Sequence, residues 1–269
     1  MVSELIERIA EVLDLVRREV PLVHHITNLV VMNDCANITL HIGGSPVMAH
    51  ALEEVEEMVS LAGSLVLNIG TLTGELVEAM ILAGKRANVK GIPVLLDPVG
   101  VGATSMRTES ARRILREVKV DIIKGNAGEV SVLAGVEAVV RGVDSVGTSG
   151  EASSVVKKLA EEYGNCAVMT GPVDWVSDGQ RTYSIYNGHK LLSNLTGTGC
   201  MAGSLTAAFA AVLGDQVMAA LSGLVCFGIA AELAAEKEQG PASFKRALFD
   251  EVCCLDGEKI KKYARVEKN

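Results

Sequence analysis

The sequence has few aromatic residues and no excess of basic ones. Phe, Trp and Tyr make up 3% of the 269 residues, whereas apolar residues make up 49%, so the core must be built mostly from aliphatic side chains and disorder is excluded as the main state. The formal net charge of -8 argues against a nucleic-acid surface, which needs clustered Lys and Arg. A small anionic ligand stays open, because backbone amides and one Lys suffice for a phosphate.

The six cysteines form no C-x-x-C pair, so neither a zinc site nor a disulfide framework is expected, and the cytoplasm is the expected location. Residues 3–8 lack the basic start and apolar run of a secretory signal. The most apolar region, Met201–Ala235, is interrupted at Gly214–Gln216. We read both parts as shorter than the roughly 18 apolar residues of a membrane span, and expect closely packed buried helices rather than a membrane partner.

Apolar strands and helices alternate along most of the chain. Strands are predicted over 20–26, 64–70, 92–98, 121–124 and 166–170, and helices over 5–16, 32–41, 51–62, 74–90, 108–117, from 127, and over 151–163. This order predicts an α/β fold with a parallel sheet covered on both faces. Residues 174–186 predict an antiparallel hairpin, and helices are predicted over 199–213, 216–238 and 242–264. Without a linker or repeat, residues 1–269 are expected to form a single domain.

Polar or Gly-rich turns follow the predicted strands. They are His24-His25-Ile26-Thr27-Asn28, Asn68-Ile69-Gly70-Thr71, Asp97-Pro98-Val99-Gly100, Lys124-Gly125-Asn126 and Thr170-Gly171. In open parallel sheets, ligands bind beyond the carboxyl ends of the strands. The convergence of Asn, Asp, Lys and Thr there favours a binding site, with ordinary turn chemistry as the alternative.

The segment Asn194–Gly203 is a Gly-rich turn that opens an apolar helix. Gly197 and Gly199 allow the amides around Thr198 and Cys200 to point at one spot, where the helix dipole also favours negative charge. This arrangement predicts an anion hole suited to a phosphoryl group. The alternative is a tight strand-to-helix turn with packing glycines, and the segment is neither a Walker A loop nor a dinucleotide fingerprint.

Two carboxylates are candidates for a magnesium site. Glu129 lies in the first turn of a predicted helix, where an acidic residue is often only a partner of the helix dipole. Together with Asp97 on a neighbouring strand end, it offers the one or two carboxylates that Mg²⁺ uses beside waters and phosphates. Lys124 is placed to neutralise a phosphate, or is simply a solvated Lys at a strand end.

Taken together, these segments resemble the hydroxyethylthiazole kinase family of the ribokinase-like superfamily. The matching pieces, in family order, are His24-His25-Ile26-Thr27-Asn28, Gly44-Ser45-Pro46-Val47-Met48-Ala49, Asn68-Ile69-Gly70-Thr71, Asp97-Pro98-Val99-Gly100-Val101-Gly102, Gly125-Asn126-Ala127-Gly128-Glu129, Thr170-Gly171 and Thr196-Gly197-Thr198-Gly199-Cys200. The resemblance implies a three-layer α/β/α fold with a mostly parallel central sheet. It also implies ATP-dependent phosphorylation of the primary alcohol of 4-methyl-5-(2-hydroxyethyl)thiazole, a step towards thiamine, by a homotrimer with the thiazole site at the subunit boundary.

The resemblance also implies a role for each matching residue. Asn28, Met48 and Gly197 fall at substrate positions, Lys124, Thr170 and Asn126 at ATP positions, Asp97 and Glu129 on the Mg²⁺ side, and Gly197, Thr198, Gly199 and Cys200 at the catalytic turn. A Met thioether packs well against a sulfur heteroaromatic ring, although a core Met would look the same.

Cys200 occupies the place where most of the wider superfamily has an Asp that accepts the proton of the attacking hydroxyl. A free thiol has a pKa of about 8.5, which a helix N-terminus can lower, so a thiolate base is one reading. Because phosphoryl transfer depends mostly on positioning and electrostatics, a residue that shapes the substrate site is the other. The five His residues are expected outside the reacting centre or on the surface, and the other five Cys residues are expected to be small buried hydrophobes.

Three competing functions fit parts of the pattern. A kinase of the same fold could act on a pyrimidine, pyridoxal or a sugar. A dehydratase of this superfamily that acts on a hydrated nicotinamide cofactor would be expected to have Asp at position 200. A non-catalytic nucleotide sensor would not need both carboxylates together with the anion hole.

Overall fold

The computed structural model describes residues 2–136, 149–238 and 240–269, and one nine-stranded sheet runs through them. Its strands, in spatial order, are β2 (Ser45–Met48), β1 (Leu22–Ile26), β3 (Ser64–Asn68), β4 (Val94–Asp97), β5 (Ile122–Asn126), β6 (Cys166–Thr170), β7 (Asp174–Ser177), β8 (Thr182–Ile185) and β9 (Val266–Lys268). The strands from β2 to β6 pair in parallel, and β7, β8 and β9 are added antiparallel. The predicted hairpin is β7–β8.

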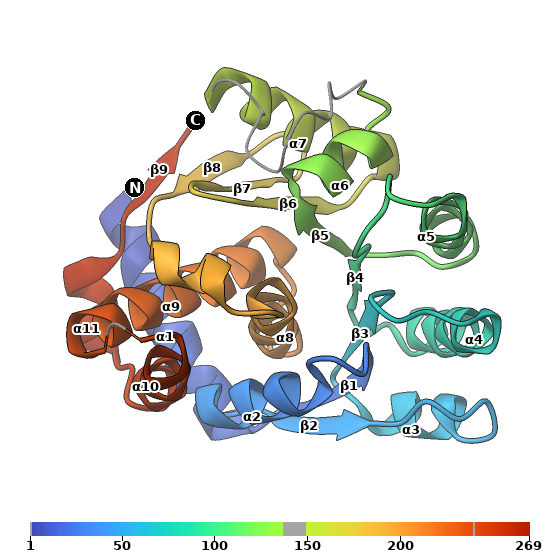
Figure 1. Cartoon of the computed structure of the whole chain (residues 1–269), viewed down its shortest axis with the longest axis horizontal. Helices are drawn as coiled ribbons and strands as arrows, with labels where there is room; N and C mark the ends of the chain where they lie inside the picture. The colour runs from blue at the N-terminus through green and yellow to red at the C-terminus, as the bar shows by residue number, and fades with distance from the viewer. Residues whose placement is uncertain (1, 137–148, 239) are drawn as a thin grey trace.

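Helices cover both faces of the sheet (Figure 1). They are α1 (Val2–Glu19), α2 (Met32–Ile42), α3 (Val55–Leu61), α4 (Gly74–Lys90), α5 (Ser105–Glu117), α6 (Ala127–Leu133), α7 (Ser149–Tyr163), α8 (Thr198–Ala210), α9 (Gln216–Lys237), α10 (Pro241–Cys253) and α11 (Gly257–Tyr263), with a short 3-10 helix over Lys190–Asn194. Helices α3, α4 and α5 lie on one side, and α1, α2, α8 and α9 lie on the other. The predicted three-layer α/β/α fold with a mostly parallel sheet is confirmed.

Helices α8 and α9 pack against each other at the centre of the layer that also contains α1 and α2. The two helices approach closely because Gly223 has no side chain: a Cβ there would lie 2.7 Å from the Thr206 hydroxyl. The expectation that both apolar stretches are shorter than a membrane span is wrong, because α9 is long and apolar enough to span one by length and composition alone. However, 89% of that stretch is buried inside the protein, which explains its apolar sequence as core packing.

Three other elements differ from the prediction. Ser45–Met48 follows a Gly-Gly turn and contains a Pro, yet it is the parallel edge strand β2, a position where Pro is tolerated. The predicted helix over 242–264 is two helices, because the side chain of Asp256 accepts a hydrogen bond from the backbone N–H of Lys259 and starts α11. The short polar strand β9 is defined by its pairing with β8.

Candidate active site

Alternation along the strands brings three polar side chains to one face. Val66, Leu95 and Ile122 belong to the apolar core on the α8 side of the sheet. Two residues further along each strand stand Asn68, Asp97 and Lys124, and side chains two apart point to the same face. Asn68 and Asp97 are also direct partners in the β3–β4 register. The carboxyl ends of neighbouring strands therefore place an amide, a carboxylate and an ammonium under the N-terminus of α8.

Gly197 sets the entry of the chain into α8. Its φ of 86° is in the left-handed region, and a Cβ at this position would lie 2.1 Å from Cγ1 of Val31, so only Gly fits. The first hydrogen bond of the helix runs from the N–H of Met201 to the carbonyl of Gly197. The N–H groups of Thr198, Gly199 and Cys200 precede that ladder and carry the positive end of the helix dipole.

Lys124 is buried rather than solvated. Only 2% of the residue is exposed, and its Nζ lies 3.3 Å from Oδ2 of Asp97. The ammonium lies close to the first turn of α8, where a Cβ on Gly199 would be 3.4 Å from Nζ. Burial alone would lower the pKa of Lys124, but the charges of Asp97, Cys200 and Glu129 outweigh it and raise the pKa. Lys124 therefore carries a fixed positive charge beside the first turn of α8.

Asn68 joins the strand ends to the helix. Its Nδ2 donates to Oδ2 of Asp97 at 2.9 Å and to Sγ of Cys200 at 3.2 Å. Its Oδ1 accepts from Nδ2 of Asn28 at 2.9 Å and from the N–H of Gly70 at 2.9 Å. From the sequence, Asn68 is noted only as part of a polar strand end. The register that sets it beside Asp97 is visible only in the folded sheet.

Asn28 is held from both ends of its amide group. Its Oδ1 accepts hydrogen bonds from the N–H groups of Val30 and Val31 at 3.1 and 3.2 Å, which fixes the turn after β1. Its Nδ2 donates to Asn68 and, at 3.5 Å, to Sγ of Cys200. Asn28 thus lies against the start of α8.

The Cys200 thiol is surrounded by donors, yet it stays protonated. Burial, followed by the charge of Asp97, raises its pKa to about 11, against the opposing effects of Lys124 and the amides of Asn68 and Asn28. The helix N-terminus therefore does not produce a thiolate at neutral pH in this structure. Of the two readings of Cys200, the geometry favours the residue that shapes the site over the preformed base.

Glu129 and Asn126 form a capping box at the start of α6. The Asn126 side chain accepts from the N–H of Glu129 at 3.0 Å, and Glu129 accepts from the N–H groups of Asn126 and Gly100, each at 2.8 Å. Burial, and then the charge of Asp97, raise the pKa of Glu129. Among the described residues, no three His, Cys, Asp or Glu side chains form a metal cluster. Two carboxylate-bearing residues with phosphate oxygens and waters nevertheless match what Mg²⁺ uses.

The remaining predicted residues lie further along the same edge. Thr170 ends β6 in register with Asn126, and its hydroxyl donates to the carbonyl of Gly125 at 3.3 Å. The Thr198 hydroxyl donates to the carbonyl of Leu192 at 3.2 Å. Met48 is half-buried at the end of the edge strand β2, in register with His25 of β1.

The adjacent His24 and His25 do not lie on the surface: both are fully buried in β1. His24 Nε2 bonds the carbonyl of Ala49 at 2.8 Å, and His25 Nε2 bonds the hydroxyl of Ser204 on α8 at 3.2 Å. Burial lowers the pKa of His25 to about 4, so it is neutral. These residues therefore support the site from within the sheet.

The prediction for the cysteines other than Cys200 is only partly right. Cys35, Cys166 and Cys226 are buried, as predicted, but the prediction is wrong for Cys253 and Cys254, which are exposed because they lie at the C-terminal end of α10.

Arg107, which the sequence did not single out, connects two of the turns. From the first part of α5 it donates to the carbonyls of Ile69, Gly70 and Val99 at 3.0, 2.8 and 2.7 Å. These turns directly follow Asn68 and Asp97. Arg107 therefore holds the two polar strand ends at a fixed separation.

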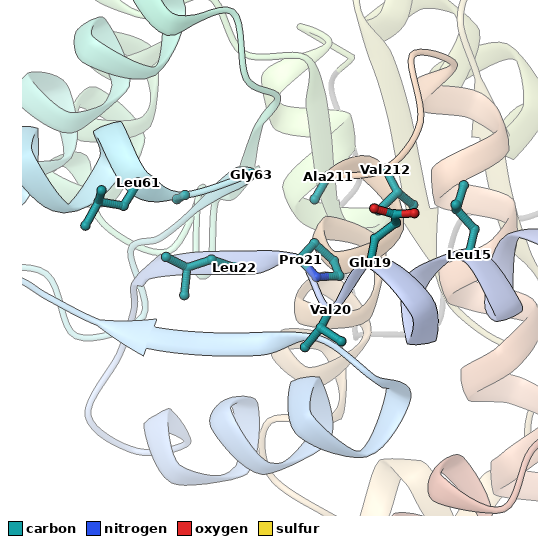
Figure 2. A pocket seen from close by; sticks show the side chains of 10 residues that line it. Leu15, Glu19, Val20, Pro21, Leu22, Leu61, Gly63, Ala211 and Val212 are labelled. Atoms are coloured by element: carbon teal, nitrogen blue, oxygen red, sulfur yellow. The ribbon is translucent and has the colours of Figure 1, made fainter.

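An open cavity of about 490 Å³ lies at the opposite edge of the sheet. Figure 2 shows its lining: Leu15, Glu19, Val20, Pro21, Leu22, Leu61, Gly63, Ala211 and Val212. Leu22 begins β1 and Gly63 precedes β3, so this cavity is at the amino ends of the strands. It is separate from the cluster of Asn68, Asp97 and Lys124 and contributes no residue to it.

Comparisons with known proteins show the family and the fold of the chain. Residues 13–258 match the profile described as the hydroxyethylthiazole kinase family. The hydroxyethylthiazole kinase of Chloroflexus aggregans is 55% identical over 260 residues, which cover 97% of this chain and 94% of that protein. A solved hydroxyethylthiazole kinase structure from Pyrococcus horikoshii is 47% identical, with a TM-score of 0.91 over 97% of this chain and 98% of that one. The pyridoxal kinase of Staphylococcus aureus, at 13% identity, covers 93% of this chain and 98% of its own with a TM-score of 0.66, and shares the fold.

Proposed function

The chain belongs to the hydroxyethylthiazole kinase family, and from that premise we propose how its residues phosphorylate the primary alcohol of 4-methyl-5-(2-hydroxyethyl)thiazole. It is a phosphotransferase of thiamine salvage, and kinase activity implies ATP as the co-substrate. The observation that carries the mechanism is the buried Lys124–Asp97 pair, 3.3 Å apart, beneath the first turn of α8.

The transferred phosphoryl group is received at the start of α8. The N–H groups of Thr198, Gly199 and Cys200 and the ammonium of Lys124 offer preorganised positive charge there. Such charge stabilises a transition state without reorganisation at the moment of reaction. Thr170 and Asn126, at the ends of the neighbouring strands, bind ATP further along the same edge.

The acceptor alcohol lies on the other side of this turn. Asn28 and Gly197 position it, and Met48 packs against the thiazole ring. Because the Cys200 thiol has its pKa raised to about 11, it remains neutral at pH 7 and acts by shaping the alcohol site. A loose transition state leaves little need for a strong base before the phosphoryl group arrives.

Magnesium is proposed as the cofactor, with Asp97 and Glu129 on its side of the site. The donor set fits, because Mg²⁺ retains waters and takes one or two carboxylates together with substrate phosphates. When bound, the ion neutralises phosphate charge. The protein's part is to orient these carboxylates, and Asn68 and Lys124 do this for Asp97 by hydrogen-bonding its Oδ2.

The assembly is proposed to be a homotrimer of single-domain chains in the cytoplasm, with the thiazole site at the subunit boundary. Leu29 and Val30 directly follow Asn28 and are 77% and 65% exposed, which supports burial of this turn by a neighbouring copy. All six cysteines are free, as a reducing compartment requires. Light scattering coupled to size exclusion tests the trimer, and a monomer at assay concentration would contradict it.

The function is tested by an ADP-release assay with ATP, Mg²⁺ and the thiazole alcohol. Hydroxymethylpyrimidine, pyridoxal and ribose are run in parallel, and omission of Mg²⁺ serves as the cofactor control. Turnover confined to the thiazole alcohol and dependent on Mg²⁺ is the expected result. Faster turnover of another alcohol would keep the phosphate site but overturn the proposed roles of Asn28 and Met48.

A further inference from the structure

Four hydrogen bonds use the full capacity of the Asn68 amide. Its oxygen accepts from Asn28 and Gly70, and its nitrogen donates to Asp97 and Cys200. Because the backbone N–H of Gly70 can only donate, the oxygen must face Gly70 and the nitrogen must face Asp97 and Cys200. The orientation of the amide is thus determined by its neighbours. Asn68 is also almost completely buried, at 1% exposure.

We propose that Asn68 is a positioning residue of the kinase reaction. Its single amide hydrogen-bonds residues on the acceptor side and on the phosphate side of the site, and so fixes their positions relative to each other. This inference rests on the proposed function of Asp97 and Cys200. The acceptor side is represented by Cys200 and Asn28, and the phosphate side by Asp97 with Lys124.

The donors on sulfur determine how the thiol is presented. Sγ of Cys200 accepts from Asn68 at 3.2 Å and from Asn28 at 3.5 Å. Those amides occupy the acceptor side of the sulfur, so the S–H bond is directed away from them. The same nitrogen of Asn68 donates to both the sulfur and the carboxylate of Asp97, two groups that present hydrogen-bond acceptors to it. A hydrogen-bond donor is therefore required at position 68.

Asn68→Asp is the sharpest test because it keeps the shape and replaces the donor by an acceptor. A carboxylate cannot donate to both Asp97 and Cys200. We expect kcat for the thiazole alcohol to fall about 10- to 100-fold, as is usual when a group that orients an active-site carboxylate is lost. The KM for ATP should change much less, since Asn68 touches none of the proposed ATP residues. Asn88→Asp is the matched control, because the Asn88 side chain likewise donates and accepts through its amide, but to the backbone of Lys119 at the amino ends of the strands.

Alkylation of Cys200 gives a readout that is independent of turnover. The rate of iodoacetamide modification at one mildly alkaline pH is followed on the Cys200 peptide by mass spectrometry. In Asn68→Asp, loss of the donor and the added negative charge should slow this rate at least about threefold. A merely structural loosening would expose the thiol and speed it. This measurement stays informative whichever alcohol the enzyme phosphorylates.

A double-mutant cycle with Cys200→Ala completes the test, and Asn68→Leu replaces Asn68→Asp if the latter does not fold. If Asn68 acts through the sulfur, the substitution at position 68 should cost several-fold less in kcat when Cys200 is absent. Faster or unchanged alkylation, or an equal loss of kcat in both backgrounds, would overturn the proposal.

Discussion

The amino and carboxyl ends of the strands, called here the amino edge and the carboxyl edge of the sheet, differ in chemistry. The amino edge has an open cavity of about 490 Å³, lined mainly by aliphatic side chains and Glu19. The carboxyl edge has the almost fully buried Asn68, Asp97 and Lys124, each hydrogen-bonded to another member of the cluster. The comparison teaches why the buried, mutually hydrogen-bonded polar groups, rather than the empty volume, are proposed as the active site.

The comparison is tested most strongly by removing one charge at each edge. Asp97→Asn should lower kcat about 100- to 1000-fold, because it removes the anion that orients Lys124 and the proposed metal. Glu19→Gln at the amino edge should leave kcat within about twofold, since surface changes away from the site have small effects. Steady-state kinetics of the two purified variants decide it. Comparable losses would mean that the amino-edge cavity takes part in the reaction.

The second test concerns the glycine at the start of α8. Gly197→Ala should reduce the free energy of unfolding by about 2–4 kcal/mol, because of its left-handed φ and the clash with Val31. Gly74→Ala is the matched control, because nothing lies within 4 Å of its missing Cβ. We expect that control to change stability by less than about 1 kcal/mol. Urea unfolding measures both, and equal destabilisation would refute the steric argument.

The third test separates the two turns that Arg107 connects. Arg107→Met should lower kcat about tenfold and the free energy of unfolding by about 1–3 kcal/mol, because the carbonyls of Ile69, Gly70 and Val99 lose a charged donor. Arg107→Lys should recover part of the stability but not the three-way contact. Kinetics and thermal unfolding should be measured on the same preparations. Unchanged kcat in Arg107→Met would show that the turns keep their separation without it.

The smallest expected effect is a pH dependence at the carboxyl edge. Burial raises the pKa of Asp174 to about 7, while its carboxylate accepts from the N–H of Gly171. Because the folded-state pKa lies above the unfolded value of about 4, the stabilising contribution is complete below pH 4 and is lost as pH rises through 7. An asparagine side chain at this position would keep the oxygen that accepts from Gly171, but it would not titrate. The stability of Asp174→Asn relative to the parent should therefore rise by about 1 kcal/mol from pH 4 to pH 8, the low figure reflecting the half-buried position.

Thermal unfolding at several pH values measures that difference. A constant difference across the range would show that Asp174 does not titrate between pH 4 and pH 8. Glu19→Gln at the amino edge provides a comparison, for which we expect no trend of this kind.

The order of strands and helices followed from the sequence because apolar runs and amphipathic helices alternate without interruption. β2 and β9 escaped detection because their conformation depends on the neighbouring strand: Pro46 and the polar Glu267 carry no strand signal of their own. The polar strand ends and the Gly-rich turn identified the edge that carries the candidate site. What they could not give was the register that sets Asn68 beside Asp97, or the long-range contacts of Arg107.

The face of the sheet that α8 and α9 cover also has a consequence for synthesis. Strands β1 to β6 are complete at Thr170, but α8 and α9 begin only at Thr198 and Gln216. A chain that emerges from the ribosome from its N-terminus therefore presents Val23, Val66 and Leu95 uncovered until more than three quarters of it has been translated. We therefore expect a product released by ribosome stalling before α8 to be prone to aggregation.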